Sequence, residues 1–167
     1  MKIQILDRAK KKKFIAGLSE LGMKKIPQLL IRSGKERIRA YSGDLSTEQI
    51  MEIWRLLPIE GVGLYVGKDM VSRSGVREIR LSLDGMHTWK DQLTERNFTL
   101  TEKQENDWFL GKNIELEEKQ IGKISDGFVS VKSSDGKDFV GVGKLGDNGK
   151  VLFGFLPKER RRKPKMQ

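Results

Sequence analysis

Glycine-containing turns divide the last third of this 167-residue chain into short apolar runs. Residues 127–133 alternate apolar and polar side chains, and an Asp-Gly turn at 134–136 separates them from a second run at 137–144. A turn at 147–149 contains Asn-Gly and precedes a third run at 150–157. Since such dipeptides favour β-hairpin turns, the pattern predicts antiparallel strands in a small barrel or curled sheet.

The second of these runs contains a Gly-x-Gly-x-x-Gly string, from Gly141 to Gly146. A dinucleotide-binding loop with this string needs a helix after its last glycine and an acidic residue about 20 positions further on. Here a turn and another apolar run follow, and the remaining chain is basic. We therefore expect the glycines to lie in a strand, where they mark bulges or close approaches of another segment. We expect no nucleotide cofactor.

The first half of the chain predicts a mixed α/β arrangement. Capping residues and stop signals indicate one helix between Asp7 and Gly22 and a second between Ser46 and Pro58. A hairpin with its turn at 33–35 lies between them. Two further strands and a short closing helix are predicted at residues 61–70, 76–83 and 84–93.

Composition narrows the function classes. The chain has no cysteine and one histidine, which excludes disulfides, thiol nucleophiles and cysteine-ligated metals, so we expect no metal site. No run approaches the roughly 20 apolar residues that a membrane-spanning helix needs, so we expect no membrane association. The absence of cysteine and of a secretory signal fits a cytoplasmic location.

Positive charge is the strongest functional signal. The net charge is +10, and nucleic acid is the commonest polyanion that such a surface binds. Trp54, Trp89 and Trp108 are candidates for stacking on bases, although positions in the core are favoured for all three. The basic residues gather in four segments, at residues 8–13, 32–39, 73–80 and 158–165.

Acidic residues and the histidine offer weaker candidates for catalysis. Asp84 precedes a glycine, where a turn or helix-cap role is favoured over a catalytic one. His87 has no obvious carboxylate and nucleophile partners in the sequence. Glu115, Glu117 and Glu118 are close together, but a solvated strand edge is favoured over a metal site.

The C-terminal half also resembles a known family. The stretches "LTEKQENDWFLGK", "GFVSV", "DFVGVGK" and "FLPKERR" follow one another within residues 98–161. This order resembles the C-terminal PUA-like domain of the Nol/Nop/Sun family of rRNA cytosine-C5 methyltransferases. The matching positions are Trp108, Gly111, Gly127, Gly141, Gly143, Lys144, Pro157, Lys158 and Arg161.

The resemblance implies RNA binding without the family's chemistry. The methyltransferases carry a large S-adenosylmethionine domain with a cysteine nucleophile, and this chain is too short for that domain and has no cysteine. PUA-like domains bind structured RNA along one edge of the barrel and the neighbouring helix. The resemblance and the clustered charge together select the candidate RNA-binding residues Gly111, Lys112, Gly141, Gly143, Lys144, Lys158, Arg160 and Arg161.

These inferences combine into one expectation. The chain is an α+β protein, with a mixed α/β domain over residues 1–94, a PUA-like β-barrel over 95–160 and a basic tail over 161–167. It is a non-catalytic protein that binds structured RNA, in particular rRNA, during rRNA processing, rRNA modification or ribosome biogenesis. Two alternatives stay open: a subunit of an RNA-modification enzyme, and a protein-binding ribosome assembly factor whose RNA contact is incidental.

Overall fold

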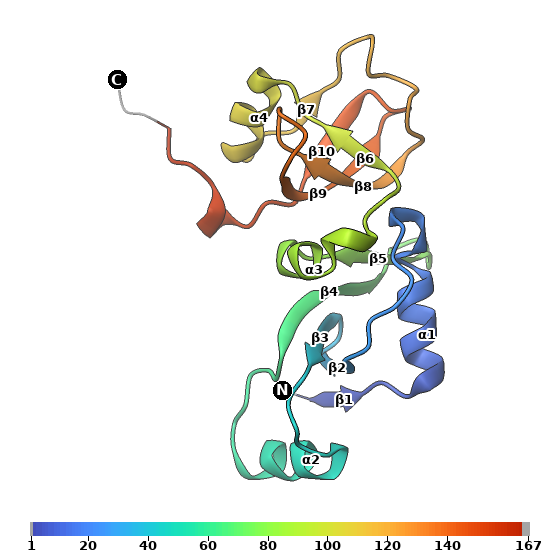
Figure 1. The fold of residues 1–167 in the computed structure, drawn as a ribbon, viewed down its shortest axis with the longest axis vertical. Helices are drawn as coiled ribbons and strands as arrows, with labels where there is room; N and C mark the ends of the chain where they lie inside the picture. The colour runs from blue at the N-terminus through green and yellow to red at the C-terminus, as the bar shows by residue number, and fades with distance from the viewer. Residues whose placement is uncertain (1, 165–167) are drawn as a thin grey trace. The chain divides into compact units, whose positions relative to one another are not determined.

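The computed structural model describes residues 2–164 and divides the chain into two compact units (Figure 1). Unit 1 comprises Met1–Ser19 and Met23–Thr88, and unit 2 comprises Glu20–Gly22 and Trp89–Gln167. Within the described residues, each unit contains a five-stranded sheet with helices beside it, so the chain is a mixed α/β protein. Residues 89–94, which the sequence analysis gave to the N-terminal domain, belong to unit 2.

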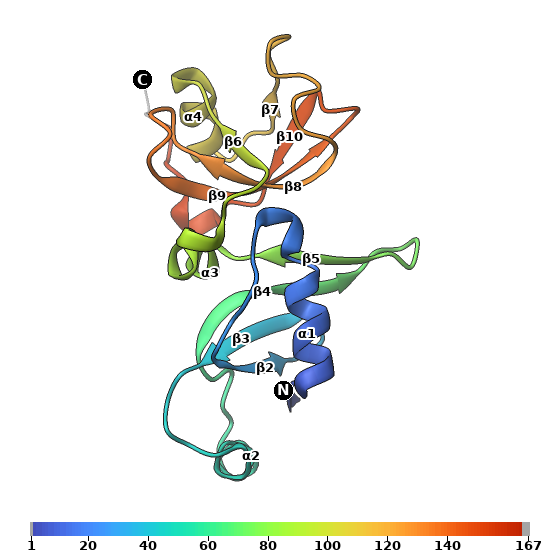
Figure 2. The same cartoon turned by 45° about the vertical axis from the view of Figure 1, so that its right-hand side comes forward.

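The sheet of unit 1 is antiparallel throughout, and its strands lie in chain order (Figure 2). Helix α1 (Arg8–Ala16) connects the first two strands, α2 (Thr47–Leu56) connects the third to the fourth, and α3 (Leu83–Thr88) follows the last. The five strands are β1 (Ile3–Ile5), β2 (Leu29–Ser33), β3 (Arg37–Tyr41), β4 (Leu64–Val71) and β5 (Arg77–Leu81).

Local signals explain where the helices of unit 1 begin. The Asp7 carboxylate accepts a hydrogen bond from the Lys10 backbone N–H at 2.8 Å, which caps α1 as predicted. Ser46 and Gln49 form the predicted capping box of α2. The prediction that α1 extends to Gly22 was wrong. The helix ends at Ala16, and a 3-10 turn (Ser19–Leu21) carries the chain onward.

Apolar side chains from the helices and strands form the core of unit 1. Phe14 and Leu18 are fully buried, so the apolar spacing seen in the sequence is kept although α1 stops between them. Ile50 of α2 packs against Ile3 and Ile31 of the first two strands. Strand β1 was not predicted, because three residues carry too little periodicity to be recognised.

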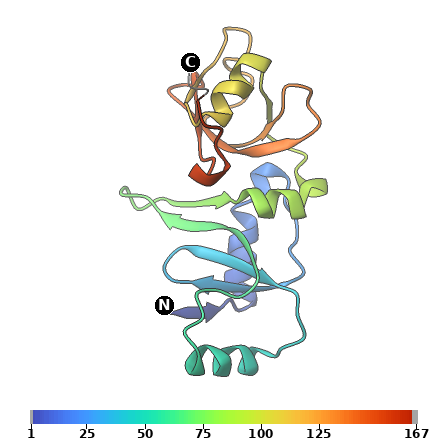
Figure 3. The same ribbon diagram turned by 90° about the vertical axis from the view of Figure 1, so that its left-hand side faces the viewer.

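The sheet of unit 2 has the order β6-β8-β9-β10-β7 and is curled (Figure 3). Strand β6 pairs with β8 in parallel, and the other pairs are antiparallel, as predicted for the glycine-punctuated runs. Helix α4 (Glu102–Phe109) lies between β6 and β7 in the chain and begins at a capping box formed by Thr101 and Gln104. The strands are β6 (Asn97–Thr99), β7 (Ile114–Glu115), β8 (Gly127–Lys132), β9 (Phe139–Gly146) and β10 (Val151–Gly154).

Short 3-10 turns flank the sheet of unit 2. Lys90–Gln92 precedes β6, and Lys158–Arg160 follows β10. The Gly-x-Gly-x-x-Gly string lies wholly within β9, and the next element is β10 rather than a helix. The prediction that these glycines belong to a strand–turn–strand segment is therefore confirmed.

Trp108 on α4 explains two of the glycines. Its indole N–H donates a hydrogen bond to the Val140 carbonyl at 3.1 Å, and its side chain is buried. A Cβ at Gly141 would lie 2.8 Å from Trp108 Cζ2, and a Cβ at Gly154 would lie 3.1 Å from Cζ3. Only glycine lets β9 and β10 come this close to the indole ring.

Gly141→Ala tests this packing. The added methyl group would meet the indole, and Gly141 has a φ of +153°, which alanine adopts with strain. Overpacking of a core costs about 1–3 kcal/mol, so we expect a loss of at least that size in the free energy of unfolding, measured by chemical denaturation.

Gly136→Ala is the matched control. Gly136 also has a positive φ, +73°, but a Cβ there would meet nothing within 4 Å. In this variant the free energy of unfolding should fall only by the cost of the backbone strain that alanine introduces, about 1 kcal/mol. Equal losses in the two variants would show that contact with Trp108 does not account for Gly141.

Candidate functional site

The C-terminal end of α4 brings together several of the predicted RNA-binding residues. Gly111 follows the helix with a φ of +78°, and a Cβ there would lie 2.6 Å from Cδ of Arg161. The Arg161 side chain therefore crosses over Gly111, and its Nε donates to the Leu156 carbonyl at 3.0 Å. Arg162 donates its backbone N–H to the Phe109 carbonyl at 2.7 Å, and its guanidinium lies 4.6 Å from the centre of the Phe109 ring.

These contacts involve the start of the predicted basic tail. Residues 161–167 were predicted as a basic tail, and its first two residues, Arg161 and Arg162, contact Gly111 and Phe109 at the end of α4. The last part of that prediction, residues 165–167, lies outside the described residues. We call the basic side chains of this region the helix-end cluster, which consists of Lys112, Lys158, Arg160, Arg161 and Arg162.

Members of the helix-end cluster are exposed to solvent. Lys112 Nζ lies 2.7 Å from Asp107 Oδ1, which leaves a surface ion pair worth at most about 1 kcal/mol. Lys158 and Arg160 occupy the 3-10 turn that precedes Arg161. The cluster can therefore exchange its contacts with water for contacts with phosphates at little structural cost.

The two predicted glycines of β9 are placed differently. Gly141 and Gly143 are buried, with their backbones facing Trp108 and Leu152. Close packing accounts for the presence of glycine at both positions. Because both residues are buried, neither offers exposed backbone that RNA could approach. Lys144 is adjacent in sequence but projects from the other face of the strand, because side chains alternate along β9.

Lys144 lies in a row of aromatic side chains. It is directly opposite Phe128 of β8 and Phe153 of β10, so the three side chains share one face of the sheet. Lys144 Nζ is 5.3 Å from the centre of the Phe128 ring. Phe155 extends the row, with its ring centre 6.0 Å from that of Phe128 and the two planes tilted by 59°. We call these four residues the aromatic face.

Two aromatic rings on this face are accessible. Phe153 is 39% exposed and Phe155 is 37% exposed, so each presents part of its ring to solvent. Neither residue was predicted as a functional candidate from the sequence. The sequence pattern could have revealed them. In an extended strand, Leu152 and Leu156 point to one face, so Phe153 and Phe155 must point to the opposite face.

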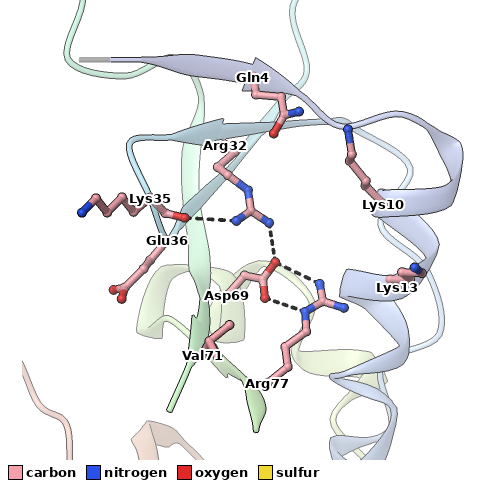
Figure 4. A pocket seen from close by; sticks show the side chains of 9 residues that line it. All are labelled: Gln4, Lys10, Lys13, Arg32, Lys35, Glu36, Asp69, Val71 and Arg77. Carbon is pink, nitrogen blue, oxygen red and sulfur yellow. Dashed lines mark hydrogen bonds and ion pairs between the residues drawn. The ribbon is translucent and has the colours of Figure 1, made fainter. Parts of the chain in front are cut away.

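A second basic surface lies in unit 1, around a buried carboxylate (Figure 4). Asp69 Oδ1 accepts a hydrogen bond from Arg77 Nε at 2.7 Å, and Oδ2 accepts one from Arg77 Nη2 at 2.9 Å. Arg32 Nη2 also donates to Oδ2. Only 5% of the Asp69 side chain is exposed, so both arginines are held on one nearly dry carboxylate.

This arrangement changes the acidity of Asp69. Burial raises the pKa of the carboxyl group, but the hydrogen bonds and positive charges of Arg77 and Arg32 together outweigh that effect. The pKa of Asp69 therefore lies below the ordinary value for aspartate. A group with a lowered folded-state pKa stabilises the fold above its unfolded-state pKa, and it loses that contribution as pH falls through the folded-state pKa.

Asp69→Asn tests this ion pair. Charged hydrogen bonds to a buried acceptor contribute about 1.5–3 kcal/mol, so we expect a loss of that order in the free energy of unfolding near neutral pH. The difference between wild type and variant should shrink as pH falls below about 4, the ordinary pKa of aspartate, because the unfolded state takes up its proton there before the folded state does. Chemical denaturation across this pH range measures the difference, and a gap that stays constant would contradict the account.

Other candidates from the sequence fall outside these surfaces. Trp89 and Trp108 are buried, as favoured, and His87 is exposed on α3. Lys119 pairs with Glu117 at 2.9 Å. Among residues 2–164, no group of three histidine, cysteine, aspartate or glutamate side chains is placed to hold a metal ion. Over the same residues, no helix has the length and apolar character needed to span a membrane.

Comparison with known proteins gives no further assignment, since no protein-family model and no curated protein matches the chain.

Proposed function

We propose that this protein binds structured RNA without catalysing a reaction on it, and that unit 2 is the RNA-docking part. In this proposal unit 2 is a PUA-like barrel, in line with the family resemblance of residues 98–161. The RNA is ribosomal, and the protein acts in the cytoplasm during rRNA processing, rRNA modification or ribosome assembly. An RNA-modifying enzyme or another assembly factor would be its protein partner.

The aromatic face is the observation that carries the proposal. Phe153 and Phe155 present accessible rings, and Lys144 supplies a positive charge between the rings of Phe128 and Phe153. Aromatic rings beside a cation suit a nucleotide, whose base stacks and whose phosphate needs neutralising. Stacking contributes about 1–3 kcal/mol for each base.

The helix-end cluster adds a second set of contacts on unit 2. Its five basic side chains gather where the segment after β10 packs against the end of α4. Each lysine or arginine that neutralises a phosphate releases a counterion, so affinity depends strongly on salt concentration. PUA-like domains, which this region resembles, use a barrel edge and its neighbouring helix in this way.

Removal of the accessible rings tests the proposed function. The double variant Phe153→Ala/Phe155→Ala should bind RNA at least about 10-fold more weakly, because it loses stacking worth about 1–3 kcal/mol for each base. The measurement is titration of a labelled RNA hairpin with single-stranded flanks, at fixed salt. Circular dichroism must show that the variant keeps its fold, because Phe153 and Phe155 are only 39% and 37% exposed and also have packing contacts.

The matched control removes two exposed apolar side chains from unit 1. Leu56 and Leu57 at the end of α2 are 80% and 58% exposed, so Leu56→Ala/Leu57→Ala removes a similar kind of surface. This control should bind the hairpin as wild type does. If the two double variants bind equally well, the aromatic face is not an RNA surface.

Exposed leucines favour a second candidate function, a protein-binding assembly factor with incidental RNA contact. Leu45 precedes α2, Leu56 and Leu57 end it, and Leu64 begins β4, and all four are substantially exposed. Leu45, Leu56 and Leu57 lie within or next to α2, and exposed apolar side chains that gather in this way are typical of protein contacts. This candidate predicts weak RNA binding that is insensitive to Phe153 and Phe155.

A further inference from the structure

The basic surface of unit 1 encloses a cavity of about 590 Å³ beside the Asp69 carboxylate (Figure 4). Its lining includes two acidic residues, Glu36 and Asp69, and five basic ones. The basic residues come from separate elements, which are α1, β2, the turn between β2 and β3, and β5. They are Lys10, Lys13, Arg32, Lys35 and Arg77.

Internal ion pairs leave part of this positive charge uncompensated. Asp69 carries one negative charge against the two arginines that bind it. Lys10 Nζ lies 3.3 Å from Asp7, and Glu36 lies 3.5 Å from Lys68 Nζ, so these pairs are balanced. The ammonium groups of Lys13 and Lys35 have no ion-pair partner among residues 2–164. The cavity therefore has an excess of three positive charges.

The arginines are already ordered. Arg32 Nη1 donates to the Lys35 carbonyl at 3.0 Å while its Nη2 binds Asp69, and Arg77 grips Asp69 with two nitrogens. The buried Nε of Arg32 has no hydrogen-bond acceptor within the described part of the chain. A ligand would therefore meet hydrogen-bond donors that are already in position. Its binding would not carry the entropic cost of ordering two long side chains.

The positive surface continues past the cavity. A neighbouring hollow of about 400 Å³ shares Lys35 and Glu36 with the first, and Arg37 and Lys68 also line it. The two hollows follow the turn between β2 and β3, which lies over residues 34–36. Adjacent basic hollows suit an anion with charges repeated along its length better than a single compact anion.

We propose that unit 1 carries a second phosphate-binding surface, on which the backbone phosphates of an RNA strand lie across the turn between β2 and β3. One phosphate occupies the cavity at Arg32 and Arg77, with Lys13 and Lys35 beside it, and Asp69 positions the two arginines. The inference rests on the proposed RNA-binding function and extends it to unit 1.

The first arm of the test uses inorganic pyrophosphate. Titration is followed by NMR of the arginine Nε–H groups, assigned by loss of each signal in Arg32→Lys and Arg77→Lys. Saturable shifts of both signals are expected in wild type. The double variant Lys13→Gln/Lys35→Gln should need a several-fold higher pyrophosphate concentration. If the Nε–H signal of Arg32 or that of Arg77 shows no saturable shift, the proposed phosphate site is overturned.

The second arm measures RNA affinity as a function of salt with the hairpin used above. Each phosphate contact to single-stranded RNA contributes about 0.7 to the slope of log K against log salt. Lys13→Gln/Lys35→Gln should therefore lower the slope by about 1.4. The control Lys12→Gln/Arg55→Gln removes the same charge from exposed positions that do not line either hollow, and its slope should change less.

The two arms separate this inference from the proposed function. Equal slopes for the pocket variant and its control, with RNA binding intact, would overturn the RNA surface on unit 1 alone. Saturable pyrophosphate binding in a wild-type protein that does not bind the hairpin would overturn the proposed function. In that case the cavity would belong to a small phosphorylated ligand, which also overturns the assignment to RNA.

Discussion

The contact between Trp108 and two glycines organises unit 2. The indole lies so close to Gly141 and Gly154 that a Cβ on either residue would crowd it. Glycine at these positions therefore lets α4 approach β9 and β10 closely. Because side chains alternate along a strand, filling one face with Trp108, Leu145 and Leu152 sends Lys144 and Phe153 to the other. The accessible aromatic face is thus a consequence of how the core on the opposite side is packed.

Charge is organised differently in the two units. In unit 2 the helix-end cluster is exposed, and Arg161 and Arg162 are its anchored members, through contacts with Leu156 and Phe109. In unit 1 the nearly dry Asp69 carboxylate fixes Arg32 and Arg77, and Lys13 and Lys35, which have no ion-pair partner among residues 2–164, line the same pocket. Exposed, adaptable cations favour rapid and salt-sensitive association, whereas preset arginines favour a defined position for one phosphate.

Local chemistry in the sequence predicted much of the fold. The capping residues Asp7 and Ser46 located the starts of α1 and α2, and the glycine turns located the antiparallel strands β8, β9 and β10. The short strands β1 and β7 and the parallel pairing of β6 were missed, because they depend on partners distant in the chain. The Arg32–Asp69 pair spans 37 positions, which no local pattern reveals. Gly141 is covered by Trp108 and Gly143 by Leu152, and neither contact can be predicted from the string of glycines alone.

Ultraviolet crosslinking of the bound RNA hairpin, with the modified residues identified by mass spectrometry, tests the central claim most directly. Rings that stack on bases are well placed to react, so the account predicts nucleotide adducts on Phe153 or Phe155. Adducts confined to other residues, under conditions where the hairpin is fully bound, would contradict it.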